Sequence, residues 1–108
     1  MAAKDLVEST ISSNKIAIFS KSWCPYCKRA KQLLTTKFPD VPTKIYELDE
    51  LDEGDAIQAY LQEKTGQRTV PNIFISQQHV GGCDSVVGLD SQGKLAGLVG
   101  APVSSSRL

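Results

Sequence analysis

The sequence is poor in cysteine and in long apolar runs, and it has no excess of either charge. Three Cys in 108 residues do not suit a disulfide-stapled secreted scaffold, so a reducing compartment and a reactive or metal-binding thiol pair are favoured. Twelve basic residues balance twelve acidic ones, which argues against the basic face of a nucleic-acid-binding protein. The longest apolar run, residues 16–19, is far shorter than the ~20 residues of a membrane span. We therefore expect a cytoplasmic protein that binds neither nucleic acid nor membranes.

The residues that are present suit one small globular domain. With 41% hydrophobic residues, a chain of this length can bury roughly 60 to 70% of its unfolded surface without disulfides. Segment 1–13 contains Asp5 and Glu8 and lacks the apolar core of a secretory signal. Residues 100–108 include three consecutive serines and are expected to form a mobile tail. We predict a single domain that spans residues 1–108.

The spacing of apolar residues predicts helices that alternate with strands. Residues 16–19 are too few for a helix and are apolar throughout, which indicates a central strand buried on both faces. The predicted order is a helix ending near residue 14, strand 16–19, a helix from residue 25, strand 44–48, a helix ending at residue 66, strands 72–75 and 78–80, and a last helical region after residue 82. This order predicts an α/β fold with helices on both faces of a small mixed sheet. The acidic residues that follow strand 44–48 suit the positive start of the next helix.

Cys24 and Cys27 lie at the junction between the buried strand and the second helix, where open α/β sheets usually place their chemistry. If Pro25 is the first helical residue, Cys24 becomes the N-cap, and its sulfur meets unpaired backbone N–H groups. These groups and the nearby Lys21 favour a thiolate, which makes Cys24 the predicted nucleophile. Cys27 lies one turn further on, at disulfide distance and beside apolar residues, so it is the predicted resolving thiol.

Two other interpretations of this pair remain open. The two cysteines could be buried small hydrophobic residues, or they could join His79 and Cys83 in a four-ligand zinc set. A structural zinc site gives no reason for Pro25 and Tyr26 at a helix start, and His79 in a short strand is more simply a half-exposed residue. We therefore predict no metal site.

Three motifs occur in order along the chain: Cys24-Pro25-Tyr26-Cys27, Thr69-Val70-Pro71 and Gly81-Gly82-Cys83-Asp84. With them the chain resembles a dithiol glutaredoxin of the CPYC type over residues 4–99. Thioredoxins share the fold but usually carry Gly-Pro between the cysteines. The resemblance implies a thioredoxin fold with a four-stranded mixed sheet in the order second, first, third, fourth, flanked by helices on both faces. It also implies a cis peptide bond between Val70 and Pro71.

The resemblance further implies an enzyme, a glutathione-dependent thiol–disulfide oxidoreductase with no permanently bound cofactor and with glutathione as co-substrate. Cys24 alone would reduce glutathione mixed disulfides, and Cys24 with Cys27 would reduce protein disulfides. The expected partners are glutathione and glutathionylated or disulfide-containing proteins, and a monomer is expected. Two alternatives stay open: a thioredoxin-like role served by a reductase protein, and an iron–sulfur carrier in which two chains and two glutathiones supply the thiolates.

Glutathione has two carboxylates and one ammonium group, so its site needs cations or N–H donors and one acceptor. By resemblance, Lys21, Gln58 and Arg68 hold the glycine carboxylate, and the helix start at Asp84 suits the γ-glutamyl carboxylate. The family commonly has Asp where this chain has Ser85, which leaves the ammonium contact to Asp84. The residues predicted to bind glutathione are Lys21, Tyr26, Gln58, Arg68, Thr69, Val70, Pro71, Gly82, Cys83 and Asp84.

Overall fold

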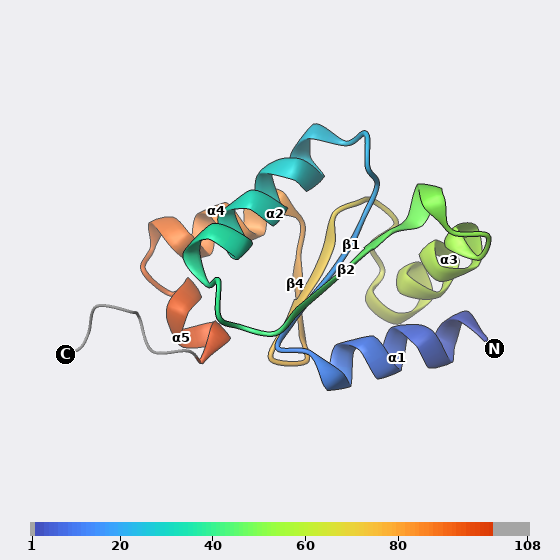
Figure 1. The fold of residues 1–108 in the computed structure, drawn as a ribbon, viewed down its shortest axis with the longest axis horizontal. Helices are drawn as coiled ribbons and strands as arrows, with labels where there is room; N and C mark the ends of the chain where they lie inside the picture. Colours follow the sequence, from blue (N-terminus) through green and yellow to red (C-terminus); the bar gives the residue numbers. More distant parts are fainter. Residues whose placement is uncertain (1, 101–108) are drawn as a thin grey trace.

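The computed structural model describes residues 2–100, in which helices cover both faces of a four-stranded sheet (Figure 1). The elements in chain order are α1 (Ala3–Ser13), β1 (Ile16–Ser20), α2 (Pro25–Lys37), β2 (Thr43–Glu47), the 3-10 turn η1 (Leu48–Glu50), α3 (Gly54–Thr65), β3 (Asn72–Ile75), β4 (Gln78–Gly81), α4 (Cys83–Ser91) and α5 (Leu95–Val99). Within residues 2–100, none of these helices has the length and apolar character needed to cross a bilayer.

The sheet has the strand order β2-β1-β3-β4. β1 runs parallel to β2 and antiparallel to β3, and β3 pairs antiparallel with β4 across a tight turn at Ser76 and Gln77. Both turn residues have positive φ, 53° and 67°, as the two-residue hairpin turn requires. The predicted mixed sheet and its strand order are confirmed, and so are the antiparallel last two strands.

The core is divided by the sheet into two apolar clusters. All five residues of β1 are buried. Ile16 and Ile18 pack with α2, α4 and α5, whereas Ala17 and Phe19 pack with α1 and α3 on the other face. Figure 1 shows these two helical layers on opposite sides of the strands. Because β1 is fixed on both faces, the segment that leaves its carboxyl end starts from a rigid point.

Several predicted boundaries differ from the structure. β1 and β4 each continue one residue beyond the predicted strands 16–19 and 78–80. The second strand covers Thr43–Glu47 rather than residues 44–48, because Leu48 turns away into η1, where its side chain is buried. The last helical region is two helices, α4 and α5, separated at Gly93, whose φ of 73° no regular helix contains. Within the predicted mobile tail, Gly100 is the left-handed C-cap of α5, and residues 101–108 lie outside the described part of the chain.

Candidate active site

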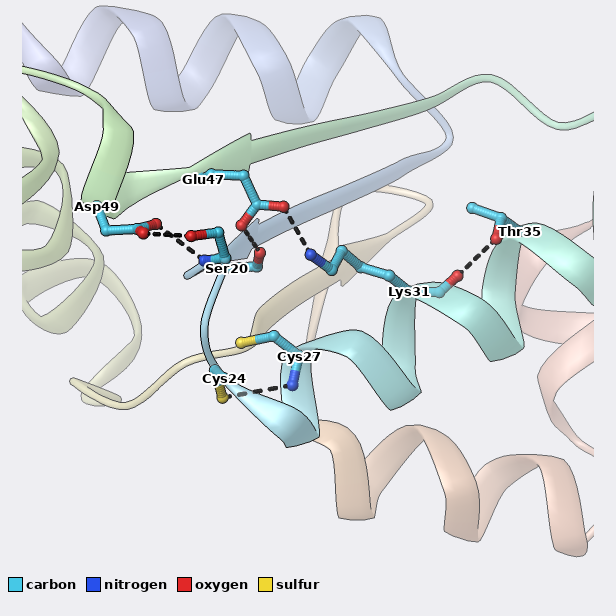
Figure 2. Close-up of polar contacts among 8 residues, drawn as sticks. Ser20, Cys24, Cys27, Lys31, Thr35, Glu47 and Asp49 are labelled. Carbon is cyan, nitrogen blue, oxygen red and sulfur yellow. Dashed lines mark hydrogen bonds and ion pairs between the residues drawn. The ribbon is translucent and has the colours of Figure 1, made fainter.

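The candidate nucleophile lies at the first turn of α2. Cys24 is the N-cap with extended backbone angles, and Pro25 occupies the first helical position. The backbone N–H of Cys27 donates a hydrogen bond to the Cys24 Sγ atom at 3.4 Å, as Figure 2 shows. The predicted N-cap geometry is confirmed. An N–H donor and the positive end of the helix both favour negative charge on this sulfur.

The second cysteine of the motif has a different environment. Cys27 is fully buried, and burial raises the pKa of its thiol, with a smaller contribution in the same direction from the Cys24 side chain. A backbone hydrogen bond from Lys21 and the charge of Lys31 act in the opposite direction. The buried Cys27 thiol therefore holds its proton firmly, which agrees with the predicted role of a resolving thiol.

A carboxylate from the neighbouring strand end fixes the segment before Cys24. Asp49 accepts a hydrogen bond from the backbone N–H of Ser22 at 2.9 Å and another from its hydroxyl at 2.5 Å. These bonds lower the pKa of the Asp49 carboxyl. The prediction that the acidic residues after β2 serve the start of α3 is therefore wrong for Asp49. Because β1 and β2 are parallel, their carboxyl ends meet at one edge, and this was the signal in the sequence that could have linked Asp49 to the active-site loop.

A groove of about 330 Å³ lies beside the motif. It brings together three distant segments: Tyr26 at the start of α2, the loop before β3, and the start of α4. The residues that line it are Tyr26, Gln67, Thr69, Val70, Pro71, Gly82, Cys83, Asp84 and Ser85. The groove therefore unites the three motifs that the sequence singled out.

The walls of the groove are open backbone and an exposed ring. The peptide bond between Val70 and Pro71 is cis, as the resemblance implied. Gly82 is the N-cap of α4, and a Cβ atom there would lie 3.6 Å from the Pro71 carbonyl oxygen, an ordinary contact that the fold could accommodate. Tyr26 is 62% exposed, so most of its ring is available to a ligand.

The chain is similar to known proteins over most of its length. The family model described as Glutaredoxin matches residues 16–80. Glutaredoxin-1 of Rhizophagus irregularis is 54% identical over 98 residues, which cover 91% of this chain and 95% of the relative. Glutaredoxin-2 of Schizosaccharomyces pombe is 50% identical over 97 residues, which cover 90% of this chain and 86% of the relative. The chain belongs to the glutaredoxin family. It is a glutathione-dependent thiol–disulfide oxidoreductase.

The fold of a solved glutaredoxin agrees with this assignment. The crystal structure of the buckwheat glutaredoxin–glutathione complex matches with a TM-score of 0.85 at 43% identity, covering 91% of this chain and 87% of that one. The match confirms the predicted thioredoxin fold. Family membership also confirms the interpretation of Cys24-Pro25-Tyr26-Cys27 as the motif of a dithiol glutaredoxin.

Three of the predicted glutathione ligands of this glutaredoxin do not line the groove. The Gln58 side-chain N–H group donates to the Arg68 carbonyl oxygen at 2.7 Å, and the Arg68 guanidinium donates to Gln62 Oε1 at 2.8 Å. The Lys21 ammonium lies 5.9 Å from the centre of the Trp23 ring. Gln58 therefore uses a donor to hold the backbone of Arg68, which the sequence did not indicate.

Sequence reasoning missed Gln67, which lies in the groove and organises its wall. Its side-chain N–H group donates to the carbonyl oxygens of Thr69, at 2.9 Å, and Pro71, at 3.0 Å. Both bonds bracket the cis peptide bond, so Gln67 holds the loop in the shape that forms the groove. A polar side chain two residues before Thr69 is a weak signal, because an exposed loop amide is the ordinary expectation.

The alternative zinc set is not assembled by this fold. His79 packs its ring 5.2 Å from Phe74, whose side chain belongs to the cluster formed with α1 and α3. Cys83 is buried in the cluster on the other face of the sheet. Among residues 2–100, no three His, Cys, Asp or Glu side chains come together as metal ligands.

Proposed function

We propose that this glutaredoxin removes glutathione from glutathionylated proteins through Cys24 alone and reduces protein disulfides through Cys24 and Cys27 together. The observation that carries the proposal is the placement of the Cys24 sulfur at the start of α2, next to a groove whose walls offer backbone N–H groups and an exposed aromatic ring. The sulfur and the groove together supply a nucleophile and a seat for a small peptide.

In the first route, the Cys24 thiolate attacks the glutathione sulfur of a mixed disulfide. The protein thiol leaves and takes up a proton, and Cys24 keeps the glutathionyl group. A second glutathione, as its thiolate, then attacks the glutathionyl sulfur, which releases glutathione disulfide and returns Cys24 as a thiolate. Cys27 takes no part in this route.

In the second route, Cys24 attacks a protein disulfide and forms a mixed disulfide with the client. Cys27 then attacks the Cys24 sulfur, which forms the Cys24–Cys27 bridge and releases the client as a dithiol. Two glutathione molecules afterwards reduce the bridge and leave as glutathione disulfide. The one-turn spacing of the two cysteines on α2 allows this bridge without unwinding the helix.

The groove is the proposed binding site for glutathione. The complex of the buckwheat relative with glutathione supports the assignment of this tripeptide to it. The start of α4 has free backbone N–H groups suited to a carboxylate, because the N-cap Gly82 provides no side-chain cap. The remaining walls are formed by Tyr26, Gln67, Thr69, Val70, Pro71, Cys83, Asp84 and Ser85. Lys21, Gln58 and Arg68 lie outside them. Asp84 is exposed at this helix start and is our candidate for the ammonium group.

The cellular setting is also part of the proposal. The low number of cysteines supports a reducing compartment, and we place the protein in the cytoplasm. We propose that it acts as a single-domain monomer, because the reaction needs no residue from a second copy.

The proposed seat predicts a preference for glutathione over a smaller adduct. A peptide in mixed disulfide with glutathione should be reduced with a kcat/KM at least about tenfold above that of the same peptide in mixed disulfide with cysteine. Cysteine lacks the γ-glutamyl and glycine ends, and each lost charge-assisted hydrogen bond costs about 1.5 to 3 kcal/mol. Initial rates with glutathione and glutathione reductase measure both substrates.

Cys27→Ser is the matched control for this preference, because it keeps the groove and the first route. It should show the same ratio between the two substrates. Equal rates for the two adducts in the wild type would overturn the assignment of the groove to glutathione. Turnover that stops without a thioredoxin reductase would instead favour the thioredoxin-like alternative.

Gln67 carries a second prediction. Gln67→Leu removes both hydrogen bonds to the loop, each with a net contribution of about 0.5 to 1.5 kcal/mol. We expect kcat/KM for the glutathionylated peptide to fall about tenfold, mainly through a higher KM, because the loop no longer holds its shape. Gln32→Leu, on the exposed surface of α2, should leave KM unchanged. An unchanged KM in Gln67→Leu would show that the loop keeps its conformation without this side chain.

A further inference from the structure

The second route requires the buried Cys27 thiol to become a thiolate. Cys27 has no exposed surface, so burial opposes the charge that the attack on Cys24 needs. A buried anion in a protein is stabilised by a nearby cation or by hydrogen-bond donors. The groups around Cys27 therefore decide how fast the second route proceeds.

A cation lies one helical turn away on the same face of α2. Residues four apart on a helix are neighbours, with about 5 to 6 Å between their Cβ atoms, and Lys31 holds this position relative to Cys27. In Figure 2 the side chains of Cys27 and Lys31 both leave α2 on the side of the helix that faces the strands. The Lys31 side chain is only 17% exposed, so water screens its charge weakly.

An anion from β2 holds this cation in place. The Lys31 ammonium forms an ion pair with Glu47 Oε2 at 2.6 Å, and the hydroxyl of the fully buried Ser20 donates to Glu47 Oε1. Figure 2 shows Glu47 between the two partners, with both of its oxygens engaged. Glu47 thus fixes the position of Lys31 and neutralises part of its field.

Few charged groups face Cys27. On α2 and its first turn these are Cys24, whose negative charge opposes a Cys27 thiolate, and Lys31, which favours it. From the segment after β1 comes a backbone hydrogen bond of Lys21. From β2 comes Glu47, which acts through Lys31. Once Cys24 is in a mixed disulfide it has no charge, and Lys31 is then the charged side chain that acts on Cys27.

We propose that Lys31 and Glu47 are positioning residues for the resolving step, with Lys31 stabilising the Cys27 thiolate and Glu47 setting how much of the Lys31 charge Cys27 experiences. The proposal rests on the second route described above. In that step Cys27 gives up its proton, attacks Cys24 Sγ and forms the Cys24–Cys27 bond while the bond from Cys24 to the client sulfur breaks. The client sulfur leaves with the electron pair and takes up a proton, so atoms and charge balance.

The two residues predict effects of opposite sign. Lys31→Met removes the cation that favours the Cys27 thiolate, so the thiolate becomes less stable. Glu47→Gln keeps an oxygen that can accept from Lys31 or Ser20, but it leaves the positive charge of Lys31 uncompensated, which favours the thiolate. A purely structural ion pair would behave differently, because loss of either partner would then have the same consequence.

The first test is a titration in which Cys27 is the one thiol of the chain, in a Cys24→Ser, Cys83→Ser background. The midpoint of the thiolate absorbance titration should rise by about one pH unit in Lys31→Met, which is a tenfold loss of thiolate at a given pH below the midpoint. It should move down by a similar amount in Glu47→Gln. Lys31→Arg should stay near the parent, and Lys28→Met, an exposed lysine of the same helix, should not move it.

The second test is the rate of client release from a Cys24 mixed disulfide with a protein thiol, in a protein that retains Cys27. Lys31→Met should slow release about tenfold at pH 7 and shift the pH–rate profile upward, whereas Glu47→Gln should shift it downward. Reduction of the glutathionylated peptide should be unaffected in both variants, because it does not use Cys27. If Lys31→Met does not fold, Glu47→Gln still tests the sign.

The outcomes separate this inference from the second route itself. Shifts of the same direction in both variants, or none in either, would overturn the roles of Lys31 and Glu47 while leaving the route intact. If Cys27→Ser reduced protein disulfides as fast as the wild type, the second route would fail. The opposite titration shifts would then stand as an electrostatic property of Cys27 without a role in turnover.

Discussion

Cys24→Ser is expected to lower the reduction of a glutathionylated peptide by about a thousandfold or more, because the nucleophile of both routes is lost. A serine hydroxyl stays protonated in the same place, and the hydrogen bond from the Cys27 N–H at 3.4 Å cannot convert it into an alkoxide. Initial rates with glutathione and glutathione reductase measure the loss. Circular dichroism and the fluorescence of the exposed Trp23 check that the variant is folded.

Cys27→Ser is the matched partner of this experiment. It should reduce the glutathionylated peptide at a rate close to that of the wild type, since a second glutathione removes the glutathionyl group from Cys24 without Cys27. It should lose the reduction of a protein disulfide, because the mixed disulfide with the client is no longer resolved by a thiol one turn away. Release of the client then depends on attack by a glutathione molecule from solution. If Cys27→Ser were as inactive as Cys24→Ser toward the glutathionylated peptide, the division of labour between the cysteines would be wrong.

The parts of the fold that depend on local signals could be predicted from the sequence. The short apolar run 16–19 indicated a doubly buried strand, and Pro25 after Cys24 indicated where α2 begins. Gly66 ends α3 with a φ of 82°, as a left-handed C-cap does. In each case the residue and its effect lie within one turn of each other, so no knowledge of the rest of the chain was needed.

Contacts between segments that are distant in the sequence were harder to predict. Asp49 holds Ser22, and Glu47 holds Lys31, across separations of 27 and 16 residues. The contact of Asp49 with Ser22 arises because β2 lies parallel to β1, and the contact of Glu47 with Lys31 arises because α2 packs on the face of the sheet that includes Ile45 of β2. The strand and helix pattern predicted this arrangement, but it does not say which polar side chains meet. The acidic residues after β2 had a simple local explanation in the start of α3, and this hid the contact of Asp49 with the active-site loop.

The groove also combines features that the sequence could predict with features that it could not. Its three motifs could be found in the sequence, and the resemblance to glutaredoxins related them to one ligand. Gln67 was missed because its importance depends on the carbonyl oxygens that the loop presents to it. The glutathione contact of Gln58 stays a prediction, and its amide donates to the Arg68 carbonyl oxygen, a contact that the sequence did not indicate. Side-chain partners of this kind follow from the path of the loop, and the path follows from packing over the whole chain.

Gly54→Ala is expected to destabilise the protein by about 3 kcal/mol, although alanine is the better helix former. Gly54 is the first residue of α3, and a Cβ atom there would lie 1.9 Å from the Leu48 carbonyl oxygen. The gain in helix propensity is about 1 kcal/mol, whereas an overpacked buried site usually costs about 1 to 3 kcal/mol and occasionally more. Since the opposing atom belongs to the backbone, no side-chain rotation relieves the contact, and we expect the steric cost to exceed the gain.

The strain in this variant should extend to the active-site loop. To make room, α3 must move away from η1, which contains the buried Leu48 and the Asp49 that holds Ser22. Gly88→Ala in α4 is the matched control, because a Cβ atom there meets nothing within 4 Å, and it should raise stability by about 0.5 to 1 kcal/mol. The denaturant midpoint should fall in Gly54→Ala and rise in Gly88→Ala, relative to the wild type. A Gly54→Ala protein as stable as the wild type would mean that α3 and η1 can separate without loss of packing.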